Sequence, residues 1–105
     1  MVYAIIYVTF PSKKAAQKIS SYLLKKKLIA CTNIFQISSS YWWKGKIENA
    51  GEFVTLLKTK SSNAKIVEAE IKKIHPYKIP CIINFKVSAN KDYEKWINKE
   101  ARGKI

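Results

Sequence analysis

The sequence predicts an α+β fold in which one sheet carries its helices on one face. The first observation is the order of the hydrophobic patterns, which alternate between strand and helix periodicity as βαββαβα along 105 residues. The second is the scarcity of linker residues, because three Gly and three Pro leave little room for a second domain. Two crossover units joined by a hairpin predict the split, ferredoxin-like sheet, in a single domain over residues 1–105.

The first strand and the first helix follow from local patterns. Val2 to Val8 is an unbroken apolar run, which is typical of a central strand covered on both faces. After Pro11, Ser12 can cap a helix whose apolar residues form one stripe. We expect this helix to run to about Lys27, because the lysines at its end suit the negative pole of the helix dipole.

Two long strands and a tight turn form the predicted hairpin. From Cys31 to Trp43 apolar and polar residues mostly alternate over an unusual length. Lys44-Gly45 then turns the chain into a second long strand, in which Asn49-Ala50-Gly51 indicates a bulge or kink. At about 3.3 Å per residue the first of these strands spans roughly 40 Å, against roughly 25 Å for the first strand of the sheet. The tip of this extended hairpin is therefore expected to project past the sheet.

A second helix, a fourth strand and an additional C-terminal helix complete the expected order. Ser61 or Ser62 opens the second helix, which should end before Pro76 because residues that precede a proline avoid helical backbone angles. Pro80 to Val87 has the alternation of a strand, and Asn90 can cap the last helix. The first and third strands are expected at the centre of the sheet.

The start of the chain and its cysteines indicate a compartment. The apolar start MVYAIIYV has no basic region and meets polar residues after eight positions, which is too short for a membrane span and unlike a secretory signal. A cytoplasmic protein without membrane contact is therefore expected. Cys31 and Cys81 are the only cysteines and have no CxxC spacing, so neither a disulfide scaffold nor a tetrahedral zinc site is indicated.

The pattern of residues does not indicate an enzyme. With three glycines, none of the glycine-rich phosphate-binding motifs can be built, and there is neither a nucleophile elbow nor a carboxylate pair near the single histidine. The third expected strand carries one aromatic residue, where an RNA-binding module with the same element order needs a stacking motif.

Three large aromatic residues lie at the expected hairpin tip. Tyr41, Trp42 and Trp43 directly precede the turn, where an isolated two-stranded ribbon would expose them to water. Such a cluster promotes aggregation unless another surface covers it. We therefore expect these residues to lie in an interface with another subunit.

Five segments of the sequence form a recognisable pattern, namely ACTNI at residues 30–34, YWWKGKIE at 41–48, LLKT at 56–59, HPYKIP at 75–80 and DYEKWI at 92–97. Their order and spacing cover nearly the whole chain and resemble the CutA family of divalent-cation tolerance proteins. The resemblance implies a homotrimer of ferredoxin-like protomers, similar in architecture to the PII nitrogen-signalling proteins, with the long hairpins packed between subunits. It also implies a function in tolerance of, or response to, divalent cations such as copper, through metal binding or ligand sensing.

Candidate ligands for copper are few. Soft ions prefer thiolate and imidazole ligands, and the chain offers His75, Cys31 and Cys81. Some family members carry a cysteine late in the first strand and a doubled histidine before the proline, and the matching positions here are Val8 and Ile74. The alternative role of His75 is local, namely a hydrogen bond to carbonyl groups at the end of its helix.

A second candidate site is a cleft between protomers. Tyr77 and Pro80 are expected to line it, and Lys58 and Glu48 to add charged groups; the alternative is a rigid loop with ordinary ion pairs between subunits. Cys81 replaces the acidic residue that usually follows the last proline in the family, which exchanges a hard-ion ligand for a soft one.

The charge of the chain supports a competing function. Twenty Lys or Arg against seven Asp or Glu give a formal net charge of +13, and all of the cations except Arg102 are lysines. Scattered lysines favour solvated faces with weak, non-specific polyanion binding over a dedicated phosphate site, to which arginine would add bidentate contacts. The alternative function is a basic RNA- or polyanion-binding module, whose affinity would fall steeply with salt.

Overall fold

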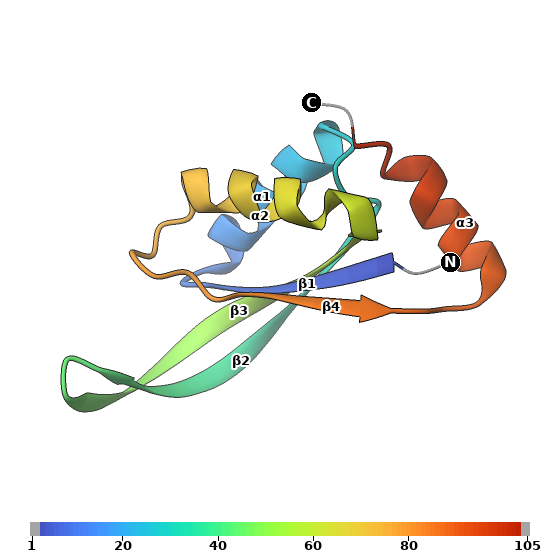
Figure 1. Cartoon of the computed structure of the whole chain (residues 1–105). Helices are drawn as coiled ribbons and strands as arrows, with labels where there is room; N and C mark the ends of the chain where they lie inside the picture. Colours follow the sequence, from blue (N-terminus) through green and yellow to red (C-terminus); the bar gives the residue numbers. More distant parts are fainter. Residues whose placement is uncertain (1–2, 104–105) are drawn as a thin grey trace.

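The computed structural model describes residues 3–103, and its elements follow the predicted order (Figure 1). One antiparallel sheet, in the order β2-β3-β1-β4, consists of β1 (Tyr3–Phe10), β2 (Cys31–Trp43), β3 (Lys46–Lys60) and β4 (Ile82–Val87). Both α1 (Lys13–Lys25) and α2 (Ala64–Ile74) lie on one face of the sheet, and α3 (Lys91–Glu100) lies at its end. The ferredoxin-like α+β fold, with β1 and β3 central, is confirmed.

The ends of the first strand and the first helix differ slightly from the prediction. Val2 lies outside the described residues, and β1 continues to Phe10 instead of ending at Val8. The Oγ atom of Ser12 accepts a hydrogen bond from the backbone N–H of Ala15 at 3.1 Å, which confirms the predicted cap. The helix ends at Lys25 rather than Lys27, because Lys27 takes a φ of 59° that helical backbone does not allow.

The start of α2 and the start of β4 are also shifted. A 3₁₀ turn over Ser61–Asn63 precedes α2, so the helix begins at Ala64 and not at either serine. The Asn63 amide is buried and donates to the carbonyl oxygens of Leu28 at 3.4 Å and Ala101 at 3.1 Å. This side chain therefore ties three segments together. The helix ends before Pro76 as predicted, whereas β4 begins at Ile82, two residues after the expected Pro80.

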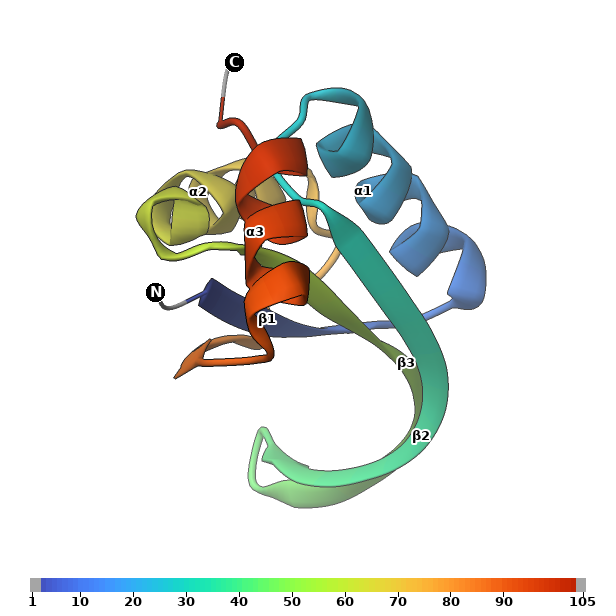
Figure 2. The same cartoon turned by 90° about the vertical axis from the view of Figure 1, so that its right-hand side faces the viewer.

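The hairpin is regular along its whole length. The ladder runs without interruption from the pair Cys31–Lys58 to the pair Trp43–Lys46, so of the bulge or kink expected at residues 49–51 the bulge is absent. Lys44 and Gly45 form the turn with φ values of 50° and 77°, as a tight two-residue hairpin turn requires. The ribbon curls away from the helices and passes beneath the sheet (Figure 2). Because no residue is inserted, we attribute this curl to the twist that accumulates along a long ribbon.

The core lies between the sheet and the two helices α1 and α2, on the side that we call the covered face. Alternate residues of β1 point into it and are 0–1% exposed, namely Ala4, Ile6, Val8 and Phe10. Leu23 from α1 and Val67 and Ile71 from α2 complete this cluster. The opposite side of the sheet, which we call the open face, carries the other residues of each strand.

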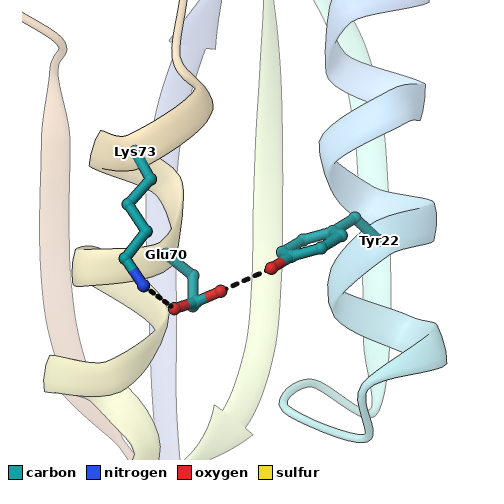
Figure 3. A network of polar contacts seen from close by, with 3 residues as sticks. All are labelled: Tyr22, Glu70 and Lys73. Atoms are coloured by element: carbon teal, nitrogen blue, oxygen red, sulfur yellow. Dashed lines mark hydrogen bonds and ion pairs between the residues drawn. The ribbon is translucent and has the colours of Figure 1, made fainter. Parts of the chain in front are cut away.

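A polar contact joins α1 to α2 beside this core (Figure 3). The Glu70 carboxylate accepts one hydrogen bond from the Lys73 ammonium at 2.8 Å and another from the Tyr22 hydroxyl at 2.6 Å. The hydrogen bonds from Lys73 and Tyr22 lower the pKa of the Glu70 carboxyl. Glu70 is therefore held ionised and connects the two helices.

Candidate functional site

The open face carries a second set of apolar side chains. The register places Tyr7 opposite Ile83 and Ile5 opposite Phe85, so these residues share the face turned away from α1 and α2. Ile83 and Phe85 are 44% and 48% exposed. Contiguous apolar surface of this kind is uncommon on a soluble protein and marks a site of interaction.

The open face and the curled hairpin together line a cleft of about 1070 Å³. Residues from β1, from both strands of the hairpin and from the segment that leads into β4 line it. The cleft brings together six of the residues that the sequence singled out, which are Tyr41, Trp42, Trp43, Glu48, Tyr77 and Cys81.

The aromatic residues at the tip remain open to solvent in the single chain. Trp42 is 72% exposed, and Tyr41 and Trp43 on the open face are 43% and 42% exposed. The ammonium of Lys44 lies 6.0 Å from the centroid of the Trp43 ring, which is a cation–π contact within the turn. Their own chain therefore covers these rings only in part, and their place in a subunit interface stays a prediction.

A buried carboxylate lies within the cleft. Glu52 is only 6% exposed and accepts a hydrogen bond of 2.5 Å from the Tyr77 hydroxyl. Burial and this hydrogen bond raise the pKa of Tyr77, so the phenol stays protonated and donates. Burial, followed by the charge of Glu52, also raises the pKa of the Cys81 thiol. Sequence reasoning missed Glu52, although its spacing from Glu48 puts the two on the same face of one strand.

His75 is held by hydrogen bonds on both ring nitrogens. Its Nδ1 accepts from the backbone N–H of Tyr77 at 3.0 Å, so Nε2 carries the proton and donates it to the carbonyl oxygen of Thr9 at 2.7 Å. The ring also stacks on Phe10, with centroids 4.7 Å apart. Burial lowers the pKa of His75, which favours this neutral form. The imidazole therefore fixes the loop after α2 to β1. Its carbonyl partner, Thr9, lies in β1 and not at the end of α2, where the sequence predicted it.

The three candidate copper ligands do not converge within one chain. Cys31 lies on β2 at one edge of the sheet, and Cys81 precedes β4 at the other edge. Three strand spacings of about 4.8 Å, or roughly 14 Å, separate these edges. Among residues 3–103 there is no group of three or more His, Cys, Asp or Glu that could hold a metal ion. The described residues of a single subunit therefore do not fit a copper centre.

Lys58 and Pro80, which the sequence predicts in a cleft between protomers, do not line the cleft of the single chain. Lys58 lies on the open face but toward the other end of β3, where its ammonium is 5.5 Å from the centroid of the Tyr93 ring. Six strand residues, or roughly 20 Å, separate it from Glu52. Pro80 lies between the lining residues Ile79 and Cys81 and shapes the loop without lining the cleft itself.

Comparison with known proteins identifies the family. A family model described as CutA1 divalent ion tolerance protein matches residues 4–100. The chain belongs to the CutA family. The divalent-cation tolerance protein CutA of Pyrococcus horikoshii is 41% identical over 99 residues, which are 93% of this chain and 97% of that protein. The Archaeoglobus fulgidus protein of the same name is 44% identical over 95 residues, with 90% of this chain and 93% of that protein covered.

Solved CutA structures have the same fold. The structure described as the periplasmic divalent cation tolerance protein CutA from Archaeoglobus fulgidus has a TM-score of 0.92 at 42% identity, covering 94% of this chain and 98% of that one. CutA1 from Oryza sativa has a TM-score of 0.91 at 30% identity, covering 95% and 94%. The similarity extends over nearly the whole of each chain, which confirms the family that the five sequence segments indicate.

Of the three positions at which this CutA chain departs from the family pattern, Cys81 lines the cleft, whereas Val8 and Ile74 do not. Val8 is fully buried on the covered face, so its side chain points toward the helices. Ile74 is the last residue of α2 and is exposed.

Within residues 3–103, no helix combines the length and the apolar character needed to cross a membrane.

Proposed function

We propose that this protein serves in the tolerance of, or response to, divalent cations, the property for which its CutA relatives are named, and that it acts by binding and not by catalysis. The observation that carries the proposal is the match to the CutA1 family over residues 4–100. The cleft supports a binding role, because it combines apolar walls with a few polar groups, as ligand sites do.

The working form in this proposal is a homotrimer of PII-like architecture. Neighbouring copies would cover the open face, where Trp43, Ile83 and Phe85 are between 42% and 48% exposed in the single chain. The hairpin extends the molecule to 45 Å along its longest axis and offers the ribbon that such packing needs. The cleft would then lie between protomers, as the sequence led us to expect.

Copper contact in this proposal depends on the thiols. Both nitrogens of His75 are already hydrogen-bonded, which leaves Cys81 in the cleft and Cys31 at the sheet edge as the soft ligands. Among the described residues 3–103, neither thiol belongs to a group of three or more candidate metal ligands. We therefore expect weaker copper binding than a dedicated site provides.

Calorimetric titration with Cu(I) and Cu(II) tests this proposal. We expect Cys81→Ser, or alkylation of the thiols, to weaken copper binding by at least about tenfold, since a thiolate is replaced by a poorer ligand. His75→Gln is the matched control and should leave the affinity within about twofold, because its amide can keep one of the two hydrogen bonds without supplying a soft ligand. If His75→Gln weakens binding as much as Cys81→Ser does, the imidazole is a ligand and the proposal is wrong on this point.

A further inference from the structure

The outer side of α1 concentrates positive charge. The chain has no acidic residue before Glu48, and α1 contains four lysines. Lys14, Lys18 and Lys25 are exposed and recur at intervals of four and seven residues, so they share one side of the helix, which we call the lysine stripe. The buried residues of α1 lie on the opposite side. The three ammonium groups therefore extend into solvent along the length of the helix.

The lysine stripe has no acidic partner, in contrast to the lysines at the end of α2. Both ion pairs in the described part of the chain lie within α2, where Lys72 pairs with Glu68 at 3.1 Å and Lys73 with Glu70 at 2.8 Å. Glu70 also faces α1, but its carboxylate is already bound by Lys73 and Tyr22 (Figure 3). The charge of the stripe is therefore uncompensated, whereas most of the charge of α2 is neutralised within that helix.

The end of the described chain adds a further cation beside α1. The backbone N–H of Gly103 donates to the carbonyl oxygen of Lys27 at 3.0 Å, which holds this segment against the loop that follows α1. Arg102, the only arginine of the chain, is exposed next to this contact, and Lys27 is exposed as well. The positive surface therefore continues past the C-terminal end of the helix.

This surface lies away from the face that the proposed trimer covers. α1 packs on the covered face of the sheet, whereas the hairpin curls beneath the open face (Figure 2). Neighbouring copies that pack on the open face and the hairpin tip leave the lysine stripe in contact with solvent. The stripe is thus available to a partner in the single chain and in the assembly.

The chemistry of the lysine stripe suits the phosphates of a nucleic-acid duplex. Single strands are held by stacking on aromatic residues, and the stripe contains none. Membrane surfaces take up apolar side chains, whereas α1 turns most of its apolar residues into the core. At about 1.5 Å per residue the stripe spans roughly 16 Å, and a duplex carries one charge per about 1.7 Å of its axis. Each ammonium can therefore meet a phosphate.

We propose that the outer side of α1 binds the phosphate backbone of double-stranded nucleic acid, irrespective of base sequence, through Lys14, Lys18 and Lys25. Each ammonium donates to phosphate oxygens and displaces a counterion, and contacts of this kind carry no sequence information. This surface goes beyond the proposed function, because it requires neither a metal ion nor the cleft.

Fluorescence anisotropy with a short labelled DNA duplex tests the proposal. In the first variant Lys14, Lys18 and Lys25 are all replaced by Gln, which keeps polar side chains on an exposed helix surface. We expect this variant to bind the duplex at least about tenfold more weakly at low salt. The slope of log affinity against log salt should fall by about three, because about one counterion is released per phosphate contact.

The matched control removes the same charge from α3. Lys91, Lys95 and Lys99 are exposed, but they lie among three acidic residues of the same helix. Replacing these three lysines by Gln should leave the salt slope unchanged and the affinity within about threefold of wild type. Equal losses in the two variants, or no duplex binding by the wild type at low salt, would overturn the proposal.

Two further probes test other anionic partners of the lysine stripe. We expect a single strand of the same sequence and vesicles of phosphatidylcholine and phosphatidylserine to bind more weakly than the duplex. Tighter binding of either probe would assign the stripe to that partner and overturn the proposal. Copper titration of the same samples keeps the two ideas separate: a protein that binds copper but not the duplex leaves the proposed function intact and removes only this inference.

Discussion

The covered face and the open face of the sheet have the same alternating pattern but differ in what covers them. On the covered face Ile6 and Phe10 are 0–1% exposed beneath α1 and α2, whereas Ile83 and Phe85 on the open face are 44% and 48% exposed. Alternation decides which side chains share a face, but it does not decide whether another element packs on that face. Because no helix of the same chain packs on the apolar open face, we expect another molecule to pack on it.

The largest effect is expected from the loss of an open-face aromatic ring at the hairpin tip. Trp43→Ala removes a large aromatic residue from each copy of the proposed interface and should cost about 3–5 kcal/mol per copy, shared between folding and assembly. We expect light scattering to show a change from trimer to monomer or aggregate. Lys44→Ala in the adjacent turn is the control and should leave the assembly intact. A stable monomeric wild type with a solvent-quenched hairpin tryptophan would contradict the assembly.

The next largest effect comes from replacing a phenylalanine on each of the two faces. Phe10 is fully buried and stacks on His75, so Phe10→Ala should lower the free energy of unfolding by about 3–5 kcal/mol. Phe85→Ala on the open face should act mainly through assembly, and its cost in urea unfolding should shrink as the protein is diluted. Equal, concentration-independent losses in the two variants would mean that both faces are already covered within one subunit.

The smallest effect is expected from a buried threonine hydroxyl on the covered face. Thr55 is fully buried, and its hydroxyl has no hydrogen-bond partner among the described residues. Thr55→Val should therefore raise the free energy of unfolding by about 1 kcal/mol, since an unpaired polar group leaves the core.

Thr59 is the matched control for this substitution. It is equally buried on the same strand, but its hydroxyl donates to the carbonyl oxygen of Leu28 at 2.6 Å. Thr59→Val should destabilise the protein by about 1–3 kcal/mol, because it leaves that buried carbonyl with one partner fewer. Thermal and urea melts measure both changes. A similar loss of stability in the two variants would mean that the Thr55 hydroxyl has a partner after all.

Much of the fold could be predicted from local sequence because local physics decides it. The cap at Ser12, the turn at Lys44-Gly45 and the full length of β2 each depend on a few adjacent residues, and the structure has all three. Of the bulge or kink expected at residues 49–51, the bulge is absent, since a glycine on a strand permits a bulge but does not require one. The five family segments likewise indicated CutA before any contact was known.

The candidate site could be predicted only in part. The sequence by itself determined that the rings of the hairpin tip, Glu48, Tyr77 and Cys81 were residues of interest. Only the tertiary structure decided that they meet in one cleft, that Glu52 joins them through Tyr77, and that Lys58 and Cys31 lie apart from them. Likewise, the hydrogen bond from His75 to the carbonyl oxygen of Thr9 depends on where the loop after α2 lies against β1. The physical reason is that periodicity and caps act over a few residues, whereas the curl of a ribbon and the register of distant strands depend on the packing of the whole chain.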